Sequence, residues 1–280
     1  MSVLRALLLM AALTFAGGAA ADGDDAKLPF TLQGDWRQGA LLIGHTVPGN
    51  QVWFNGRALS VSPDGDFVFG LDRDEPAQAE LKVQLPGAAP QVYRYAVEKR
   101  QYEIQNINGL PPKMVNPPPA VQQRIANDQR LAREARQHDS PRRDFLQRFI
   151  WPCAGPISGV YGSQRILNGE PKQPHYGVDV AVPVGTPVRA PAGGVISLAE
   201  KDMYFTGGTL MIDHGQGVAS AFLHLSKLLV KVGDVVQQGQ VIALSGKTGR
   251  ATGPHLDWRM NWFESRIDAQ QLAGAMTAKP

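Results

Sequence analysis

Three short segments in the C-terminal half of the chain contain imidazole and carboxylate side chains at close spacing. They are His175-Tyr-Gly-Val-Asp179, Phe222-Leu-His224-Leu-Ser226 and Thr252-Gly-Pro-His255-Leu-Asp257-Trp258. Zinc prefers imidazole and carboxylate ligands, and a catalytic zinc site leaves one position open for water. These residue types are therefore suited to binding a zinc ion.

The spacing of these residues constrains the backbone that carries them. If the chain were fully extended, the Cα atoms of His175 and Asp179 would lie roughly 13 Å apart, at about 3.3 Å per residue. Because one ion is not easily shared over that distance, we expect the chain to bend at Gly177. His255 and Asp257 are two residues apart, so on a strand both side chains point to the same face.

The three segments are part of a longer series of motifs. The series comprises His175-x-x-x-Asp179, Ala190-Pro-Ala-Gly-Gly-Val195, Ile212-Asp-His-Gly215, His224-Leu-Ser226, Val232-Gly-Asp-x-Val236, Gly239-Gln-x-Ile242 and Thr248-Gly-Arg-Ala-Thr-Gly-Pro-His-Leu256. From about Trp151 to Asp268 the chain resembles the lysostaphin-type, or LytM-type, peptidoglycan zinc metallopeptidases. The order of several motifs makes this resemblance specific. It extends to exported Gram-negative members, in which a β-sandwich and a helical linker precede the peptidase domain.

The resemblance implies a role for most of the site residues. His175 and Asp179 become zinc ligands, and His224 and His255 become the catalytic histidines. The implied reaction is hydrolysis of a peptide bond in a peptidoglycan stem or cross-link peptide by a zinc-activated water. One histidine would accept the proton and the other would stabilise the oxyanion. Zinc is then the cofactor and peptidoglycan the partner, with further partners among cell-division proteins or wall hydrolases.

The third ligand position departs from the family pattern. The family has the second His of a His-x-His there, and this chain has Asp257. The Oδ1 of Asp and the Nδ1 of His are equally far from Cα along the side chain, and carboxylate binds zinc at roughly 2.0–2.2 Å, so Asp257 is the predicted third ligand. Two carboxylates neutralise the ion, which then acidifies its water less. Arg259, on the same strand face, could return positive charge or tie up Asp257 in a salt bridge.

Two hypotheses for the site therefore stay open. In the first, the chain is an active peptidoglycan metallo-endopeptidase. In the second, it is a degenerate LytM domain that binds peptidoglycan or activates another wall hydrolase without catalysis. Biotinyl and lipoyl carriers share the Gly-Asp-x-Val and Gly-Gln-x-Ile hairpins. No lysine stands at an exposed hairpin tip with the expected flanks, however, so structural hairpins are favoured over a carrier.

The residues around these motifs predict a mainly β protein. Alternating β-branched residues from Trp151 onward, such as Val178 and Val180, predict a larger antiparallel β domain over residues 151–272. Residues 27–100 show short strand patterns separated by Asn55-Gly56 and similar turns, which predict a small antiparallel β-sandwich. The strands expected there are Ala40–His45, Gln51–Phe54, Asp66–Gly70, Glu80–Leu85 and Val92–Val97.

Residues 101–150 are predicted to be a Pro-rich and helical linker. Two proline clusters near its start make the chain stiff. Residues 120–138 are rich in helix formers and have only a thin apolar stripe, which predicts an exposed helix laid against a neighbour. Ser140-Pro141 fits an N-cap followed by a first-turn proline and predicts a second short helix ending near Phe149.

The N-terminus carries the pattern of an export signal. Arg5, an apolar run from Ala6 to Ala16 and small residues at 19–21 predict a cleaved signal peptide over residues 1–21 and a periplasmic protein. The apolar run is too short for a comfortable membrane span, and we expect no transmembrane segment in the mature chain. The formal net charge of +3 over 280 residues does not indicate a nucleic-acid binder. The single cysteine, Cys153, excludes an internal disulfide.

Overall fold

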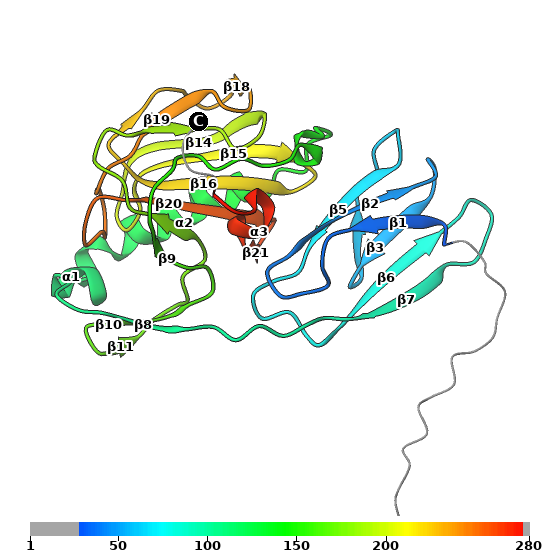
Figure 1. Cartoon of the computed structure of the whole chain (residues 1–280), viewed down its shortest axis with the longest axis horizontal. Coiled ribbons are helices and arrows are strands. Elements are labelled where there is room, and N and C mark those ends of the chain that lie inside the picture. Colours follow the sequence, from blue (N-terminus) through cyan, green and yellow to red (C-terminus); the bar gives the residue numbers. More distant parts are fainter. Residues whose placement is uncertain (1–27, 277–280) are drawn as a thin grey trace, which may run out of the picture.

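The computed structural model describes residues 28–276, which form two β domains joined by a long segment (Figure 1). The predicted signal peptide, residues 1–21, lies outside the described residues. Across residues 28–276, no helix has the length and apolar character needed to cross a membrane.

The N-terminal domain is a sandwich of two antiparallel sheets, with strand orders β1-β2-β5 and β4-β3-β6-β7. Its strands are β1 (Phe30–Gln33), β2 (Leu41–Thr46), β3 (Gln51–Phe54), β4 (Arg57–Leu59), β5 (Asp66–Gly70), β6 (Gln78–Gln84) and β7 (Gln91–Ala96). The five expected strands are confirmed, whereas β1 and β4 were not expected. Asn55 and Gly56 take φ angles of 44° and 83°, as a tight hairpin between β3 and β4 requires.

The C-terminal domain is built on a large antiparallel sheet with the order β18-β14-β15-β16-β20-β12-β9, and β21 pairs with β20. A smaller sheet has the order β13-β19-β17. The strands are β9 (Ile157–Gly159), β12 (Val178–Val180), β13 (Pro187–Arg189), β14 (Gly194–Met203), β15 (Gly207–Gly215), β16 (Val218–Leu225), β17 (Lys227–Leu228), β18 (Val235–Val236), β19 (Val241–Leu244), β20 (Leu256–Trp262) and β21 (Ser265–Ile267). The expected mainly β architecture is confirmed.

Both faces of the large sheet are buried. Leu210, Ile212 and Phe222 point into the main core, while Met211 and Leu223, their neighbours in sequence, point to the opposite face. Helix α2 (Gln122–Arg136) covers part of that opposite face. Burial on both faces explains the continuous apolar runs Leu210–Ile212 on β15 and Ala221–Leu223 on β16, although the sheet is antiparallel.

The segment between the domains contacts the C-terminal domain along much of its length. Strand β8 (Ile104–Ile107) pairs in parallel with β10 (Gln164–Leu167), which also pairs with β11 (Glu170–Pro171). The short helices α1 (Pro112–Val115) and η1 (Pro119–Val121) follow. The expected helix is confirmed as α2, whose Ala135 packs with the apolar face of β14 to β16.

The prediction of a second helix from Ser140-Pro141 to Phe149 is wrong. Only a 3-10 turn, η2 (Asp144–Leu146), forms there. The backbone is held by long-range contacts instead, because the carbonyl of Ser140 accepts a hydrogen bond from the amide of Gln216. Arg143 forms an ion pair with Asp66 of the sandwich. These tertiary contacts outweigh the local helix signal.

The two domains share one apolar core. Phe54 of the sandwich lies edge-on to Trp262 of β20, with ring centroids 6.1 Å apart. Gly70 on β5 packs so closely against Trp262 and Ile267 that an added Cβ would lie 2.8 Å from the Cβ of Trp262. The short C-terminal helix α3 (Ala269–Ala273) begins beside Asp268, which forms an ion pair with Arg100 at 2.9 Å. We therefore expect the domains to unfold together.

Replacement of Trp262 by Ala should lower the free energy of unfolding by about 3–5 kcal/mol, as for other large aromatic side chains removed from a core. The matched control is Val235→Ala on the same sheet, because Val235 is 65% exposed; its effect should stay within about 0.5 kcal/mol. Urea denaturation followed by circular dichroism measures both. Two separate unfolding transitions in the wild type would contradict the shared core.

Candidate metal centre

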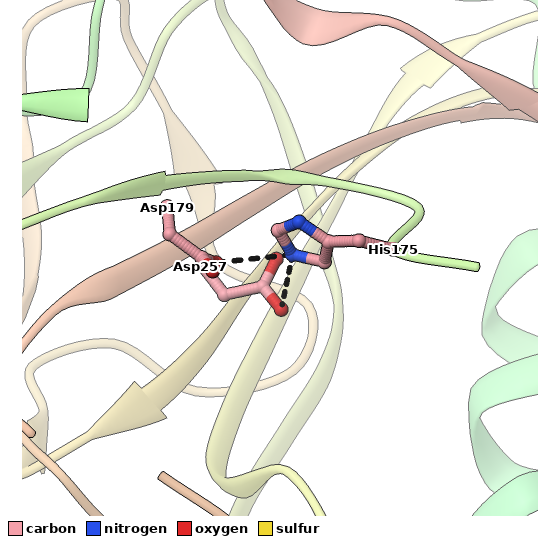
Figure 2. Close-up of side chains that lie close together, drawn as sticks. All are labelled: His175, Asp179 and Asp257. Atoms are coloured by element: carbon pink, nitrogen blue, oxygen red, sulfur yellow. Dashed lines mark ion pairs between the residues drawn. The ribbon is translucent and has the colours of Figure 1, made fainter. Parts of the chain in front are cut away.

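Two carboxylates lie directly opposite each other on neighbouring strands. Asp179 on β12 and Asp257 on β20 are Cα partners in the antiparallel pairing of these strands. His175 precedes β12 and turns its ring toward both carboxylates (Figure 2). All three side chains are buried, and one ligand atom from each lies within 4.8 Å of the others. The structure thus brings together the three residues predicted as metal ligands.

The separations of these atoms are close to those between two ligands of one zinc ion. Nε2 of His175 lies 3.0 Å from Oδ1 of Asp179 and 3.4 Å from Oδ2 of Asp257. Two ligands bound tetrahedrally to one zinc at roughly 2.0–2.2 Å would be about 3.3–3.6 Å apart. Nε2 of His175 and Oδ1 of Asp179 are buried, and neither has an aligned hydrogen-bond partner. Buried polar atoms are normally satisfied, so these two atoms fit a shared cation, which would take the place of the proton that makes His175 positively charged without metal.

Gly177 makes this approach of the strands possible. We expected a bend at this glycine, but its φ angle is not in the left-handed region. A Cβ added at Gly177 would instead collide with Oδ1 of Asp257 and lie 2.7 Å from Cγ of Arg259. The glycine is needed for space between β12 and β20, rather than for an unusual backbone conformation.

Two arginines also bind the carboxylates. Nε of Arg259 donates to both oxygens of Asp257, at 3.0 and 3.1 Å, and Nη2 donates to Oδ2 at 2.6 Å. Nη2 of Arg165 donates to Oδ2 of Asp179 at 2.9 Å. Each carboxylate oxygen has two lone pairs, so Oδ1 of Asp257, which accepts only from Nε of Arg259, keeps one lone pair for a metal ion.

These ion pairs keep both carboxylates charged. Burial alone would raise the pKa of Asp257, but the charges of Arg259 and His175 hold that pKa well below its usual range. For Asp179, burial and the charge of Asp257 act in the same upward direction. The positive charges of His175 and Arg165 outweigh them and lower the pKa of Asp179. The carboxylates are therefore in the protonation state that a metal ligand requires.

His224 reaches the same site through a strained backbone. On β16, Leu223 is paired with Asp257, so simple alternation would direct His224 to the opposite face of the sheet. His224 instead has a φ angle of 62°, in the left-handed region that non-glycine residues rarely adopt. Its ring consequently lies 4.7 Å from the ring of His255. Strain of this kind is often found at functional sites.

Hydrogen bonds to backbone carbonyls fix the ring orientation and the neutral tautomer of both histidines. Nδ1 of His224 donates to the carbonyl of Thr248 at 2.7 Å, and Nδ1 of His255 donates to the carbonyl of Gly253 at 2.9 Å. A carbonyl only accepts, so each Nδ1 carries the proton and each Nε2 is left with a free lone pair. Burial lowers the pKa of His224 to about 4, which keeps this ring uncharged at neutral pH.

His214 shows the contrasting structural arrangement. It lies on β15, fully buried, with Nδ1 2.6 Å from the carbonyl of Gly193 and Nε2 2.6 Å from Oγ of Ser220. Both ring nitrogens are thus occupied by the protein itself. Cys153 is also unsuited to catalysis, because burial raises the pKa of its thiol to about 12.

A cavity of about 150 Å³ opens beside the metal centre. His224, His255 and Asp179 line one part of it, and Arg165 and Arg250 line another. Neither arginine was predicted from the sequence as a site residue. Arg165 lies on β10, outside the recognised motifs, and Arg250 was included only as one letter of the motif that ends at Leu256. Their convergence depends on long-range contacts.

Comparisons with known proteins agree with this geometry. Residues 173–269 match the model of Peptidase family M23. The peptidoglycan DD-endopeptidase ShyA of Vibrio cholerae is 47% identical over 87 residues, which cover 31% of this chain and 20% of ShyA. The DD-carboxypeptidase/endopeptidase Mpg of Neisseria meningitidis is 42% identical over 106 residues, which cover 38% of this chain and 23% of Mpg.

A solved structure is similar over most of the chain. The crystal structure of a putative peptidase M23 from Pseudomonas aeruginosa is 29% identical, with a TM-score of 0.68. The similarity covers 86% of this chain and 96% of that one. The chain belongs to peptidase family M23. It spans only about a fifth to a quarter of the curated relatives that it matches.

The packing at Gly177 gives a direct test of the metal centre. Gly177→Ala should displace the carboxylate of Asp257 and weaken zinc binding by about 10–100-fold, the range seen when groups that support metal ligands are disturbed. Gly253→Ala is the matched control, because nothing lies within 4 Å of a Cβ added there. Competition against a chromophoric chelator measures both affinities. Equal affinities in the two variants would contradict the assigned ligand geometry.

Proposed function

We propose that this chain is an exported zinc metallo-endopeptidase that hydrolyses peptide bonds in peptidoglycan. The observation that carries this proposal is the convergence of His175, Asp179 and Asp257 beside two histidines whose Nε2 atoms are free. Its support comes from the family and from relatives such as ShyA, which is a peptidoglycan DD-endopeptidase. Export to the periplasm by residues 1–21 belongs to the same proposal.

The residues of the chain suggest how such a reaction proceeds. When bound, zinc would polarise the attacking water and the scissile carbonyl. His255 is then the proton acceptor, because its Nε2 atom lies 3.9 Å from Oδ1 of Asp179 and so faces the metal centre at which the water would be held. The neutral ring of His224 accepts the second hydrogen bond of the water and orients it. His255 finally returns its proton to the leaving nitrogen as the C–N bond breaks, giving a carboxylic acid and an amine.

One observation favours a second candidate function. Arg259 contacts both oxygens of Asp257 and neutralises this carboxylate with no metal required. Under this alternative, Asp257 and Arg259 form a structural ion pair, and the chain is a non-catalytic domain that binds peptidoglycan or activates another wall hydrolase. The two functions predict different effects of the same substitutions on zinc binding.

Zinc binding across variants of this ion pair separates the two functions. We expect about one zinc per chain in the wild type, none in Asp257→Ala, and partly weakened binding, by about 10–100-fold, in Arg259→Ala. Asp202→Ala is the matched control, since Asp202 is an exposed aspartate that also pairs with an arginine, Arg124. Metal analysis and chelator competition give the values. Unchanged zinc affinity in Asp257→Ala would favour the non-catalytic alternative.

The histidines should affect catalysis without affecting the metal. His255→Ala is expected to lower the rate of cleavage of purified peptidoglycan by about 10²–10⁴-fold, the usual contribution of a general base. Its zinc content should stay at the wild-type level, because His255 is not among the three ligands. His138→Ala, which removes an exposed histidine from the linker, serves as control. Loss of zinc in His255→Ala would show that the ligand set is misassigned.

A further inference from the structure

The side chains around the metal centre carry an excess of positive charge. Three guanidinium groups, those of Arg165, Arg250 and Arg259, meet two carboxylates. Arg165 pairs with Asp179 and Arg259 pairs with Asp257. Among residues 28–276, no carboxylate lies within ion-pairing distance of Arg250. The charge of Arg250 is therefore not balanced by the protein.

The surroundings of Arg250 make its unbalanced charge unfavourable for the stability of the fold. Its guanidinium packs over the ring of Phe205, 4.5 Å from the centroid, and Nη1 donates to the carbonyl of Met114 at 3.1 Å. That single bond uses one of five N–H donors. Burial and the nearby charges of Arg165 and Arg259 lower the pKa of Arg250 to about 10, so the group is still charged at neutral pH. A partly buried, unpaired cation destabilises a fold unless a ligand compensates it.

The position of Arg250 indicates which ligand would do so. Arg250 lines the same cavity as His224, His255 and Asp179, so a group bound there lies beside the reacting atoms. A divalent ion at the metal centre would add two further positive charges close by. Both effects favour an anion in the cavity. A guanidinium group binds planar anions through two parallel N–H groups, and the planar anion that a peptide carries is a carboxylate.

We propose that Arg250 is a specificity-determining residue that binds a free carboxylate of the substrate peptide beside the scissile bond. This inference rests on the proposed function and narrows its substrates to peptides that carry a carboxylate near the bond that is cut. Arg165 supports the pocket from β10, but its ion pair with Asp179 leaves Arg250 as the main binding group. The carboxylate comes either from a side chain or from the C-terminus of a stem peptide.

Binding of a stem tetrapeptide to the zinc-loaded full chain tests this proposal, by calorimetry. We expect the free acid to bind about 10–100-fold more tightly than the peptide with every carboxylate amidated, the range for hydrogen bonds to charged groups. Peptides amidated only at the C-terminus or only at side chains identify which carboxylate is bound. In Arg250→Gln the preference should disappear through weaker binding of the acid alone, and Arg250→Lys should keep part of it.

Arg189→Gln is the control for general loss of positive charge, because Arg189 is exposed on β13 and outside the cavity; its preference should match the wild type. Equal affinity of wild type for the acid and the fully amidated peptide would overturn the role of Arg250. So would an equal loss for both peptides in Arg250→Gln. A preserved preference without cleavage of peptidoglycan would overturn the proposed function while leaving the carboxylate site in place.

Discussion

The constraint on which the site depends is the burial of two like charges on adjacent strands. Asp179 and Asp257 face each other across β12 and β20, where two uncompensated carboxylates would repel each other strongly. Positively charged groups compensate this repulsion. His175 contacts the carboxylates, Arg165 pairs with Asp179, and Arg259 pairs with Asp257. Glycines clear the space for this arrangement, because a Cβ at position 177 would meet Asp257 and one at position 159 would meet Asp179.

The arginine behind Asp257 changes the meaning of the aspartate at this position. The family pattern has a neutral imidazole where this chain has a carboxylate, and a carboxylate alone would reduce the charge of a bound ion. Asp257 and Arg259 together carry no net charge, and in this respect the pair is equivalent to a neutral imidazole. The electrostatic difference between an aspartate and a histidine ligand is thus largely removed by a residue two positions further along the same strand.

Sequence patterns were sufficient where the determinants are local. Alternation and turn residues predicted most strands of the sandwich, and the spacing of His255 and Asp257 placed them on one strand face. Sequence patterns were insufficient where contacts between distant residues determine the backbone conformation. The left-handed φ angle of His224 reverses the side of the sheet on which its ring lies. Nothing in the residue types around position 224 predicts this backbone conformation. The non-helical path through Ser140 and Arg143 likewise depends on partners far away in the chain.

The cavity also shows how the segment before the peptidase domain contributes to the site. Strand β8 pairs with β10, so it fixes the strand that carries Arg165. The carbonyl of Met114, next to α1, holds the guanidinium of Arg250. Residues 101–116 therefore position both arginines of the cavity, although they lie outside the matched family region. The central sheet builds the metal centre, and the chain leading into it positions the arginines of the cavity; the ion pair of Arg165 with Asp179 connects the two.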